Sequence, residues 1–387
     1  MYMAELAPPS IRGGLVNFYQ SWMMVGAILA CSVVYGAFYN AAGKWIYLTP
    51  IVVQIIPPVL LLMAVWFIPE SPRWLLSKNK KEQALKALLY MRKGASSEEE
   101  TAQELDLVAA ATEQEIELHR ASSYLDCFRG SNFYRTLVAV GVQCLQQAQG
   151  NSFTQAYLVI FLQQLGVNDP LLIKIAHACC SFGGTVLAFY LTDELGRRKM
   201  LIGGAFLMGA TLWVTSGLAA WTPGGVHGAK AQTAIAMILL NAAISTGAWG
   251  SCMWTVTVEV STQQLRERTI ALATIFGFIT SLLITYINPY VQNEPGNLGA
   301  KVGLIYGSMS VIAIAFVYFI VPEMKGRSLE ELDEMFHSRV PAWRSKAFVS
   351  DGLGAQITRV QNADASVMDT KSSDHESIQE TPHSKGL

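Results

Sequence analysis

Charge is scarce in this chain. Of its 387 residues, 15% are Asp, Glu, Lys or Arg and 51% are hydrophobic, whereas soluble domains carry about 25% charged residues. The formal net charge is −1, so the chain has no excess of positive charge with which to attract nucleic acid. This deficit indicates that a lipid bilayer surrounds most of the chain.

Motifs of enzymes and metal sites are also missing. The six cysteines show no zinc-ligand spacing and fall mostly in apolar stretches, where Cys usually serves as a small packing residue. There is no nucleotide-binding loop and no pairing of a nucleophile with a base, so we expect no enzyme activity, no cofactor and no metal. The charges of Glu5 and Arg12 argue against a signal peptide at the start.

What the chain has in abundance is long apolar segments. A helix needs about 20 apolar residues to cross the hydrocarbon core of a bilayer. Every backbone N–H and C=O in lipid needs an internal partner, so such segments are expected to be helices. Eight segments qualify: 14–38, 46–68, 136–164, 171–192, 200–221, 233–258, 269–291 and 302–321. The predicted fold class is therefore an all-α membrane protein.

Positive charges alternate between the connections of these segments. Loops on the cytosolic side of a membrane are enriched in Lys and Arg. That rule predicts a multi-pass protein with the following parts in the cytosol: 1–12, 69–135, 193–199, 259–268 and the C-terminus. We expect the membrane to be the plasma membrane.

Four regions follow from these patterns. Within the long polar loop, the apolar positions 84, 85, 88 and 89 predict an amphipathic helix. A second helix is predicted to begin at Ser96–Ser97, where acids follow in the first turn. The polar end of the chain is predicted to be disordered. The regions are two membrane helices (1–78), a cytosolic helical insert (79–132), a six-helix half (133–336) and a disordered tail (337–387).

A pattern of charges occurs twice. Each copy has a Glu seven residues before an Arg and a second Glu 64 or 65 residues after the first: Glu5, Arg12 and Glu70, then Glu259, Arg266 and Glu323. Internal repeats of this kind build many transporters. Only the second copy has an Asp-x-x-Gly-Arg-Arg run upstream, starting at Asp193. A counterpart for the first copy would lie before Met1, so we expect the chain to lack the start of the repeat.

The motifs resemble the signatures of the sugar porter family of the major facilitator superfamily. These motifs occur in the order and spacing of that family, at 4–13, 69–75, 193–198 and 322–328. A further similarity, to the fungal hexose and α-glucoside permeases, lies at 266–269, 288–289 and 299–301. The resemblance implies a major facilitator-type bundle of twelve helices in two halves around a central site. On that pattern, 14–38 corresponds to the fifth helix and 302–321 to the twelfth, and the first four helices are absent.

Charges at the predicted cytosolic helix ends suggest a gate. Carboxylates and guanidinium groups can pair when that face is closed and separate when it opens. The alternative is that these charges only set the topology, although topology depends on the bases alone. The candidate gate residues are Glu5, Arg12, Glu70, Arg73, Asp193, Arg197, Arg198, Glu259, Arg266 and Glu323.

Amides inside a membrane segment suggest a sugar site. A sugar offers many hydroxyls and a few apolar faces, so its site needs amides and an aromatic platform. Segment 136–164 is rich in amides, which are costly in lipid unless they face a wet cavity. Alternatively, these amides hold helices together. With positions implied by the resemblance, the candidates are Gln20, Gln146, Gln147, Asn151, Tyr157 and Trp254.

These observations predict transport of a hexose or an α-glucoside by alternating access. Protons are an open partner, because no Asp or Glu lies at mid-depth in any segment and only Lys174 and His177 are ionisable well inside one. The predicted partners are a sugar, the lipid bilayer and no nucleic acid, and the oligomeric state stays open. The alternative function is a sugar sensor, or a truncated permease that transports nothing.

Overall fold

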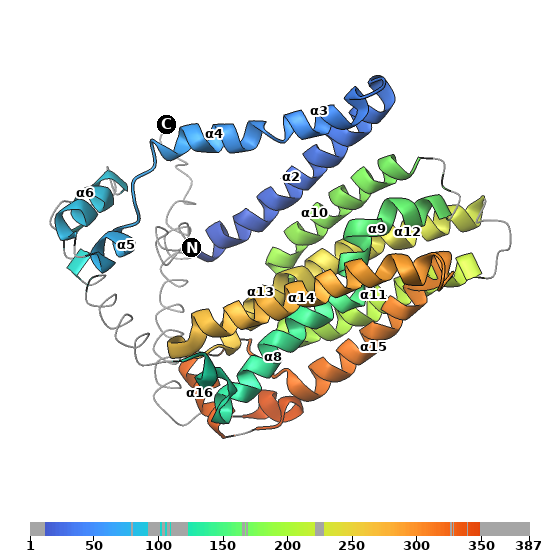
Figure 1. Cartoon of the computed structure of the whole chain (residues 1–387). Coiled ribbons are helices and arrows are strands. Elements are labelled where there is room, and N and C mark those ends of the chain that lie inside the picture. Colours follow the sequence, from blue (N-terminus) through green and yellow to red (C-terminus); the bar gives the residue numbers. More distant parts are fainter. Residues whose placement is uncertain are drawn as a thin grey trace, which may run out of the picture.

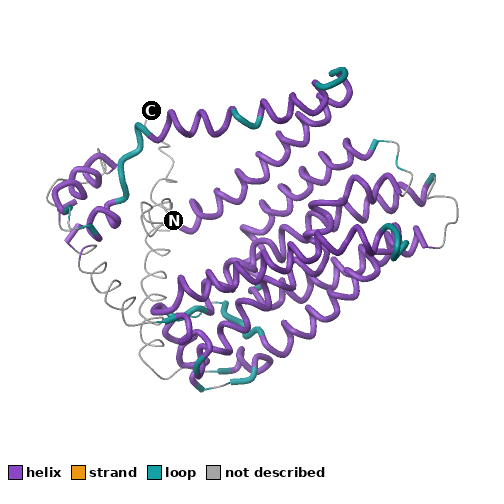
Figure 2. Tube along the Cα trace, viewed as in Figure 1, coloured by secondary structure: helices purple, strands orange, loops and turns teal. Residues whose placement is uncertain are grey.

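Helices make up almost all of the described chain. They lie side by side in an elongated bundle, joined by short loops (Figures 1 and 2). The computed structural model describes residues 12–78, 80–91, 101–102, 105–106, 109, 123–164, 167, 169–220, 228–325, 327, 329–338 and 340–348. Within these ranges there is no β-strand, and the predicted all-α fold is confirmed.

In the described residues, the bundle consists of eleven α-helices that follow the predicted segments. They are α2 (Arg12–Asn40), α3 (Trp45–Val53), α4 (Ile56–Val65), α8 (Gly130–Gln146), α9 (Ser152–Gln164), α10 (Pro170–Leu195), α11 (Arg197–Ala220), α12 (Ala229–Ile244), α13 (Ser251–Val260), α14 (Arg266–Gln292) and α15 (Val302–Ile320). Short helices outside it are η1 (Tyr124–Phe128), α5 (Pro72–Ser77), α6 (Lys81–Met91), α16 (Leu329–His337) and η6 (Ala342–Ala347).

Seven helical stretches of the described chain are long and apolar enough to cross a membrane. Two of them join two α-helices: α3 continues into α4, and α12 continues into α13. The eighth predicted segment, 136–164, is also helical, but it consists of α8 and α9 with a break between them. Its amides, the feature that made it a candidate site, also make it the least apolar of the eight.

The helices α2, α3 and α4 form an outer hairpin. α2 packs against α10, and the hydroxyl of Tyr39 near its end donates a 2.6 Å hydrogen bond to Asp169, which precedes α10. α3 and α4 contain no buried residue. Figure 1 shows them along the upper edge, beyond α2 and away from the other helices. Their apolar side chains are therefore left for lipid or for further protein to cover.

Two buried clusters hold the remaining bundle together. One lies around Trp249 and Met253 and extends to Met335 on α16. The other contains Phe153, which stacks on Tyr306 with ring centroids 5.0 Å apart. The second cluster fixes the first turn of α9 against α15, immediately beyond the break in segment 136–164.

The long polar loop and the end of the chain add small packed units. The predicted amphipathic helix is confirmed as α6, which buries Ala84, Ala87 and Leu88. The helix predicted from Ser96–Ser97 lies outside the described residues. Residues 340–348 were predicted to belong to the disordered tail, and for them that prediction is wrong: Ser345 is fully buried and accepts the backbone N–H of Glu323 at 2.9 Å. Residues 349–387 lie outside the described residues.

Candidate functional site

Two helices are interrupted where they approach each other. The π-helical turn η2 (Gln147–Asn151) separates α8 from α9, and η3 (Ser245–Gly250) separates α12 from α13. Gly150 in η2 has a φ of 102°, which favours glycine. A Cβ on Gly250 would lie 4.0 Å from the side-chain nitrogen of Gln146. Such turns are frequent at functional sites, so this junction is the first place to look for one.

Three predicted amides meet at this junction, and we call Gln146, Gln147 and Asn151 the amide cluster. The Gln147 side-chain oxygen accepts from the Ser152 hydroxyl at 2.7 Å and from Asn151 at 3.4 Å, and its nitrogen donates to Gln146 at 3.4 Å. The Ser152 hydroxyl lies 2.8 Å from that of Ser281 on α14. The two amide–amide contacts, at 3.4 Å, are longer than the usual range for such bonds, so they hold the amides only weakly to one another.

Other polar groups of the same segment tie helices together. Gln143 donates to Thr257 on α13 at 3.5 Å and packs against Gly277 of α14. The hydroxyl of Tyr157, a predicted sugar contact, donates to the backbone oxygen of Thr285 at 2.8 Å. The alternative interpretation of the amides therefore fits Gln143, and Tyr157 already has a structural partner.

The remaining two sugar candidates do not bond to the amide cluster. Trp254 lies one turn beyond Gly250, and 43% of its surface is exposed, as an aromatic platform requires. Trp249, by contrast, is fully buried and donates its indole N–H to Leu201. Gln20 is half-buried on α2, which packs against α10. In the described part of the chain, neither Gln20 nor Trp254 makes a hydrogen bond to the cluster.

The gate candidates include one close ion pair. Arg197, at the start of α11, donates to Glu259, at the end of α13, at 3.0 Å. Both side chains are largely buried, with 15% and 23% of their surfaces exposed. Burial costs both charges their hydration, so either charge would be left uncompensated if its partner were removed. This bond fastens two membrane helices at the end of the bundle where the predicted gate charges lie, which we call the charged end.

Glu323 lies at the same end. Its carboxylate accepts the backbone N–H groups of Met324 and Lys325 at 3.1 and 3.2 Å. Gly196 just before α11 has a φ of 86°, and a Cβ there would lie 2.9 Å from that carboxylate. The negative charge therefore lies beside the positive end of the α11 dipole, where it is stabilised.

The other gate candidates are placed differently. Arg198 lies over the ring of Tyr318 and donates to the backbone oxygen of the same residue at 2.8 Å. Both described contacts of Arg198 are therefore with Tyr318. Two guanidinium nitrogens of Arg266 are buried without a hydrogen-bond partner in the described residues. Glu70 is exposed after α4. Glu5 and the side chains of Arg12, Arg73 and Asp193 lie outside the described residues.

Sequence reasoning missed a second ion pair at the charged end, in which the arginine is buried. Arg135 on α8 is 2% exposed, pairs with Asp333 on α16 at 2.5 Å, and lies over the Phe336 ring. Burial lowers the pKa of Arg135, and the neighbouring Asp333 carboxylate opposes that shift. A lone Arg at the start of a membrane segment was the available signal, but its partner lies 198 residues away.

Lys174 also has an unexpected position. Its ammonium group donates to the backbone oxygens of Thr154 and Gln155 on α9, at 3.1 and 3.2 Å. It therefore ties α10 to α9 just beyond the break at Gly150. His177, one turn further along α10, is buried.

The fold and the junction define a multi-pass membrane protein of the major facilitator type. A family model described as "Sugar (and other) transporter" matches residues 1–336. The chain belongs to this family, which is one of transporters rather than enzymes. The resemblance predicted from the charged motifs is confirmed.

Relatives in this family are similar along most of the chain. The major facilitator-type transporter ecdD of Aspergillus rugulosus is 30% identical over 347 residues, which are 87% of this chain and 64% of that protein. The high glucose sensor RGT2 of Saccharomyces cerevisiae is 29% identical, over 87% of this chain and 45% of that protein. A general alpha-glucoside permease of the same yeast is 26% identical, over 96% and 61%. The chain thus spans less than two thirds of the length of these relatives.

Solved structures agree with this placement. The inward open xylose transporter XylE from E. coli superposes with a TM-score of 0.68 and 26% identity, covering 87% of this chain and 68% of that one. The proton:xylose symporter XylE bound to 6-bromo-6-deoxy-D-glucose gives 0.65 and 26%, covering 87% and 69%.

Proposed function

We propose that this chain binds a hexose or an α-glucoside and moves it across a membrane by alternating access. The observation that carries the proposal is the amide cluster, which gathers donors and acceptors where two broken helices meet. Hydroxyl-rich ligands need groups that both donate and accept. Names of relatives that include glucose, galactose and alpha-glucoside transporters support the same substrate class.

The breaks suggest how the site would move. A π-turn interrupts the regular ladder of a helix, so the two parts of that helix can tilt relative to each other. α9 could then tilt over a bound sugar while α8 stays packed against α13 and α14. Asn151 and Ser152, which lie at the break, would carry a change in ligand contacts directly to α9.

The Arg197–Glu259 pair would act at the charged end of the bundle, away from the amide cluster. Formed, it holds the start of α11 to the end of α13 and favours a closed charged end. Opening would separate the charges and hydrate them. We further propose that the charged end and the C-terminus face the cytosol, as the distribution of Lys and Arg predicts, and that the membrane is the plasma membrane. We propose no catalysed reaction.

A sugar sensor is the second candidate. A sensor needs the binding site and the conformational change but no complete pathway, and RGT2 is named as a glucose sensor. The uncovered apolar surface of α3 and α4 also fits a bundle that gains further helices before it transports. In that case, the chain alone would bind sugar without moving it.

Uptake and binding together separate these possibilities. Radiolabelled glucose and maltose uptake would be measured, with and without a proton uncoupler, in cells without sugar permeases of their own. Binding to purified protein would be measured in parallel, and Gln147→Ala would test the cluster against Gln83→Ala on the amphipathic helix α6. Uptake and binding that only Gln147→Ala lowers would support transport. Binding without uptake would support the sensor, and no binding of either sugar would contradict both.

A further inference from the structure

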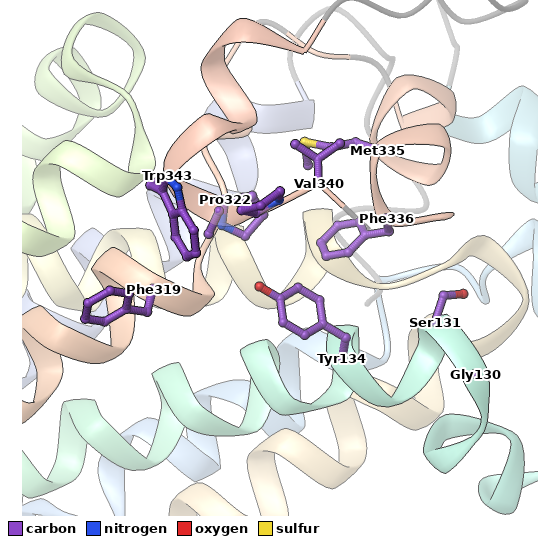
Figure 3. A pocket seen from close by; sticks show the side chains of 11 residues that line it. Gly130, Ser131, Tyr134, Phe319, Pro322, Met335, Phe336, Val340 and Trp343 are labelled. Carbon is purple, nitrogen blue, oxygen red and sulfur yellow. The ribbon is translucent and has the colours of Figure 1, made fainter. Parts of the chain in front are cut away.

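An apolar cavity opens at the charged end, away from the amide cluster. It has a volume of about 410 Å³ and lies between the first turns of α8, the end of α15, α16 and the start of η6. Figure 3 shows Tyr134 at its centre, with Phe319 and Trp343 on one side and Phe336 on the other. We call this space the interfacial cavity. Its size and apolar lining fall in the range of small-molecule sites.

The walls of the cavity offer few polar groups. The Tyr134 hydroxyl donates a 2.7 Å hydrogen bond to the backbone oxygen of Ile320. The remaining lining is mainly rings and aliphatic side chains, among them Met335 and Val340. A ligand for this space therefore needs an apolar part to fill it.

One rim of the cavity belongs to the membrane-facing surface. Phe319 lies in the last turn of the spanning helix α15 and is 57% exposed, and Trp343 packs edge-on against it and is 49% exposed. Phe319 also packs edge-on against Tyr318, which is 46% exposed. Exposed aromatic rings at the end of a spanning helix are typical of the boundary between hydrocarbon and headgroups. At that boundary, lipids would be the molecules that meet this rim.

A positively charged side chain lies next to the last of these rings, Tyr318. The guanidinium of Arg198 lies 5.1 Å from the centre of the Tyr318 ring. An arginine at headgroup depth can bind a phosphate group bidentately. A row of contacts thus leads from the Arg198 guanidinium over Tyr318 and Phe319 to Trp343 at the cavity.

We propose that the interfacial cavity binds one acyl chain of a phospholipid, whose phosphate group contacts Arg198. The lipid would come from the leaflet on the charged side. A chain held there would fill the space between α8, α15 and η6, and would link the gate end of the bundle to the lipid around it. The proposal stands independently of sugar transport, because it rests on a different part of the molecule.

The test uses the full chain, purified in detergent, stripped of lipid and then given phosphatidylcholine. Native mass spectrometry would count the lipids that survive collisional activation. We expect one retained phosphatidylcholine, which Ser131→Phe removes by filling the cavity. The matched control is Ser308→Phe, because Ser308 is exposed on α15 outside the cavity. Arg198→Gln should weaken retention about tenfold, as expected for one lost bond to a charged group.

Two further measurements use a second filled variant and a photoreactive lipid. If Ser131→Phe fails to fold, Val340→Phe fills the cavity from the opposite wall. Phosphatidylcholine with a photoreactive group in its acyl chain should label peptides that contain 130–134 and 340–343. Equal retention by the parent and a folded filled variant, or labelling confined to the outer faces of α3 and α14, would overturn the proposal.

Discussion

The helices α8 to α15 and the hairpin of α2 to α4 differ in how much of their apolar surface is buried against other helices. Each contains stretches long and apolar enough to cross a membrane, yet half of the apolar stretch in Arg197–Leu218 is buried and none of that in Trp45–Val65 is. In the packed stretch, glycines of α15 meet α11 closely: Gly303 packs against Ser216, and Gly307 against Trp213. Residues 45–65, by contrast, contain no glycine and a single alanine. Small residues let membrane helices approach closely, whereas lipid is as good a neighbour as protein for a surface of large apolar side chains.

The largest effect is expected from a side chain added where backbones touch. A Cβ at Gly184 on α10 would run into the backbone oxygen of Ala243, whereas one at Gly26 on α2 would meet nothing within 4 Å. Gly184→Val should cost about 3 kcal/mol or more of stability, and Gly26→Val should not destabilise the protein. Thermal unfolding of the purified variants measures this. Equal melting temperatures of the two variants would mean that α10 and the Ala243 backbone are packed less closely than described.

Two tryptophans among the helices α8 to α15 allow the same comparison between a buried and an exposed side chain. Trp249→Ala removes a fully buried ring and should cost about 3–5 kcal/mol of folding stability. Trp254→Ala removes an exposed ring and should barely change stability, but should lower sugar affinity about tenfold, within the range of lost ring contacts. Calorimetric titration with sugar and unfolding curves separate the two. Unchanged sugar binding in the Trp254 variant would remove this residue from the site.

A third test concerns the two arginines near the start of α8. Arg135→Met takes away the partner of Asp333 and should cost about 2 kcal/mol, since the arginine is buried but the aspartate is half exposed. Arg129→Met breaks a pair that is largely exposed, with Asp126, and should cost less than about 0.5 kcal/mol. Similar losses in chemical unfolding would show that burial does not decide the value of these pairs.

Apart from the exposed counterparts used for comparison, the smallest loss of stability is expected at the gate. Glu259→Gln keeps the shape of the side chain and weakens its bond to Arg197 by about 1 kcal/mol. The charged end should then open more often, while the relative affinities for different sugars stay unchanged. Labelling of a cysteine introduced at Thr262 would report the opening. A changed substrate profile would argue against the gate role.

Local patterns were sufficient for some features and insufficient for others. Apolar length predicted the membrane helices, and amide density in one segment pointed to Gln146 and Gln147, because both signals lie in consecutive residues. The pairing of Arg135 with Asp333 joins distant residues, so no local pattern contains it. The packing of Ser345 against Glu323 was missed for another reason: its surroundings are polar in sequence, and one buried hydroxyl with a backbone partner is enough to fix the segment.

The ammonium group of Lys174 is held by two backbone oxygens of α9 inside a membrane-spanning part of the bundle. A charge fixed to a helix feels the electrical potential across the membrane. Moving one elementary charge through the whole potential changes its energy by about 2.3 kcal/mol per 100 mV. If α9 and α10 shift along the membrane normal when the protein changes state, they carry this charge with them. Membrane voltage would then bias the two states, even with an uncharged sugar and no coupled ion.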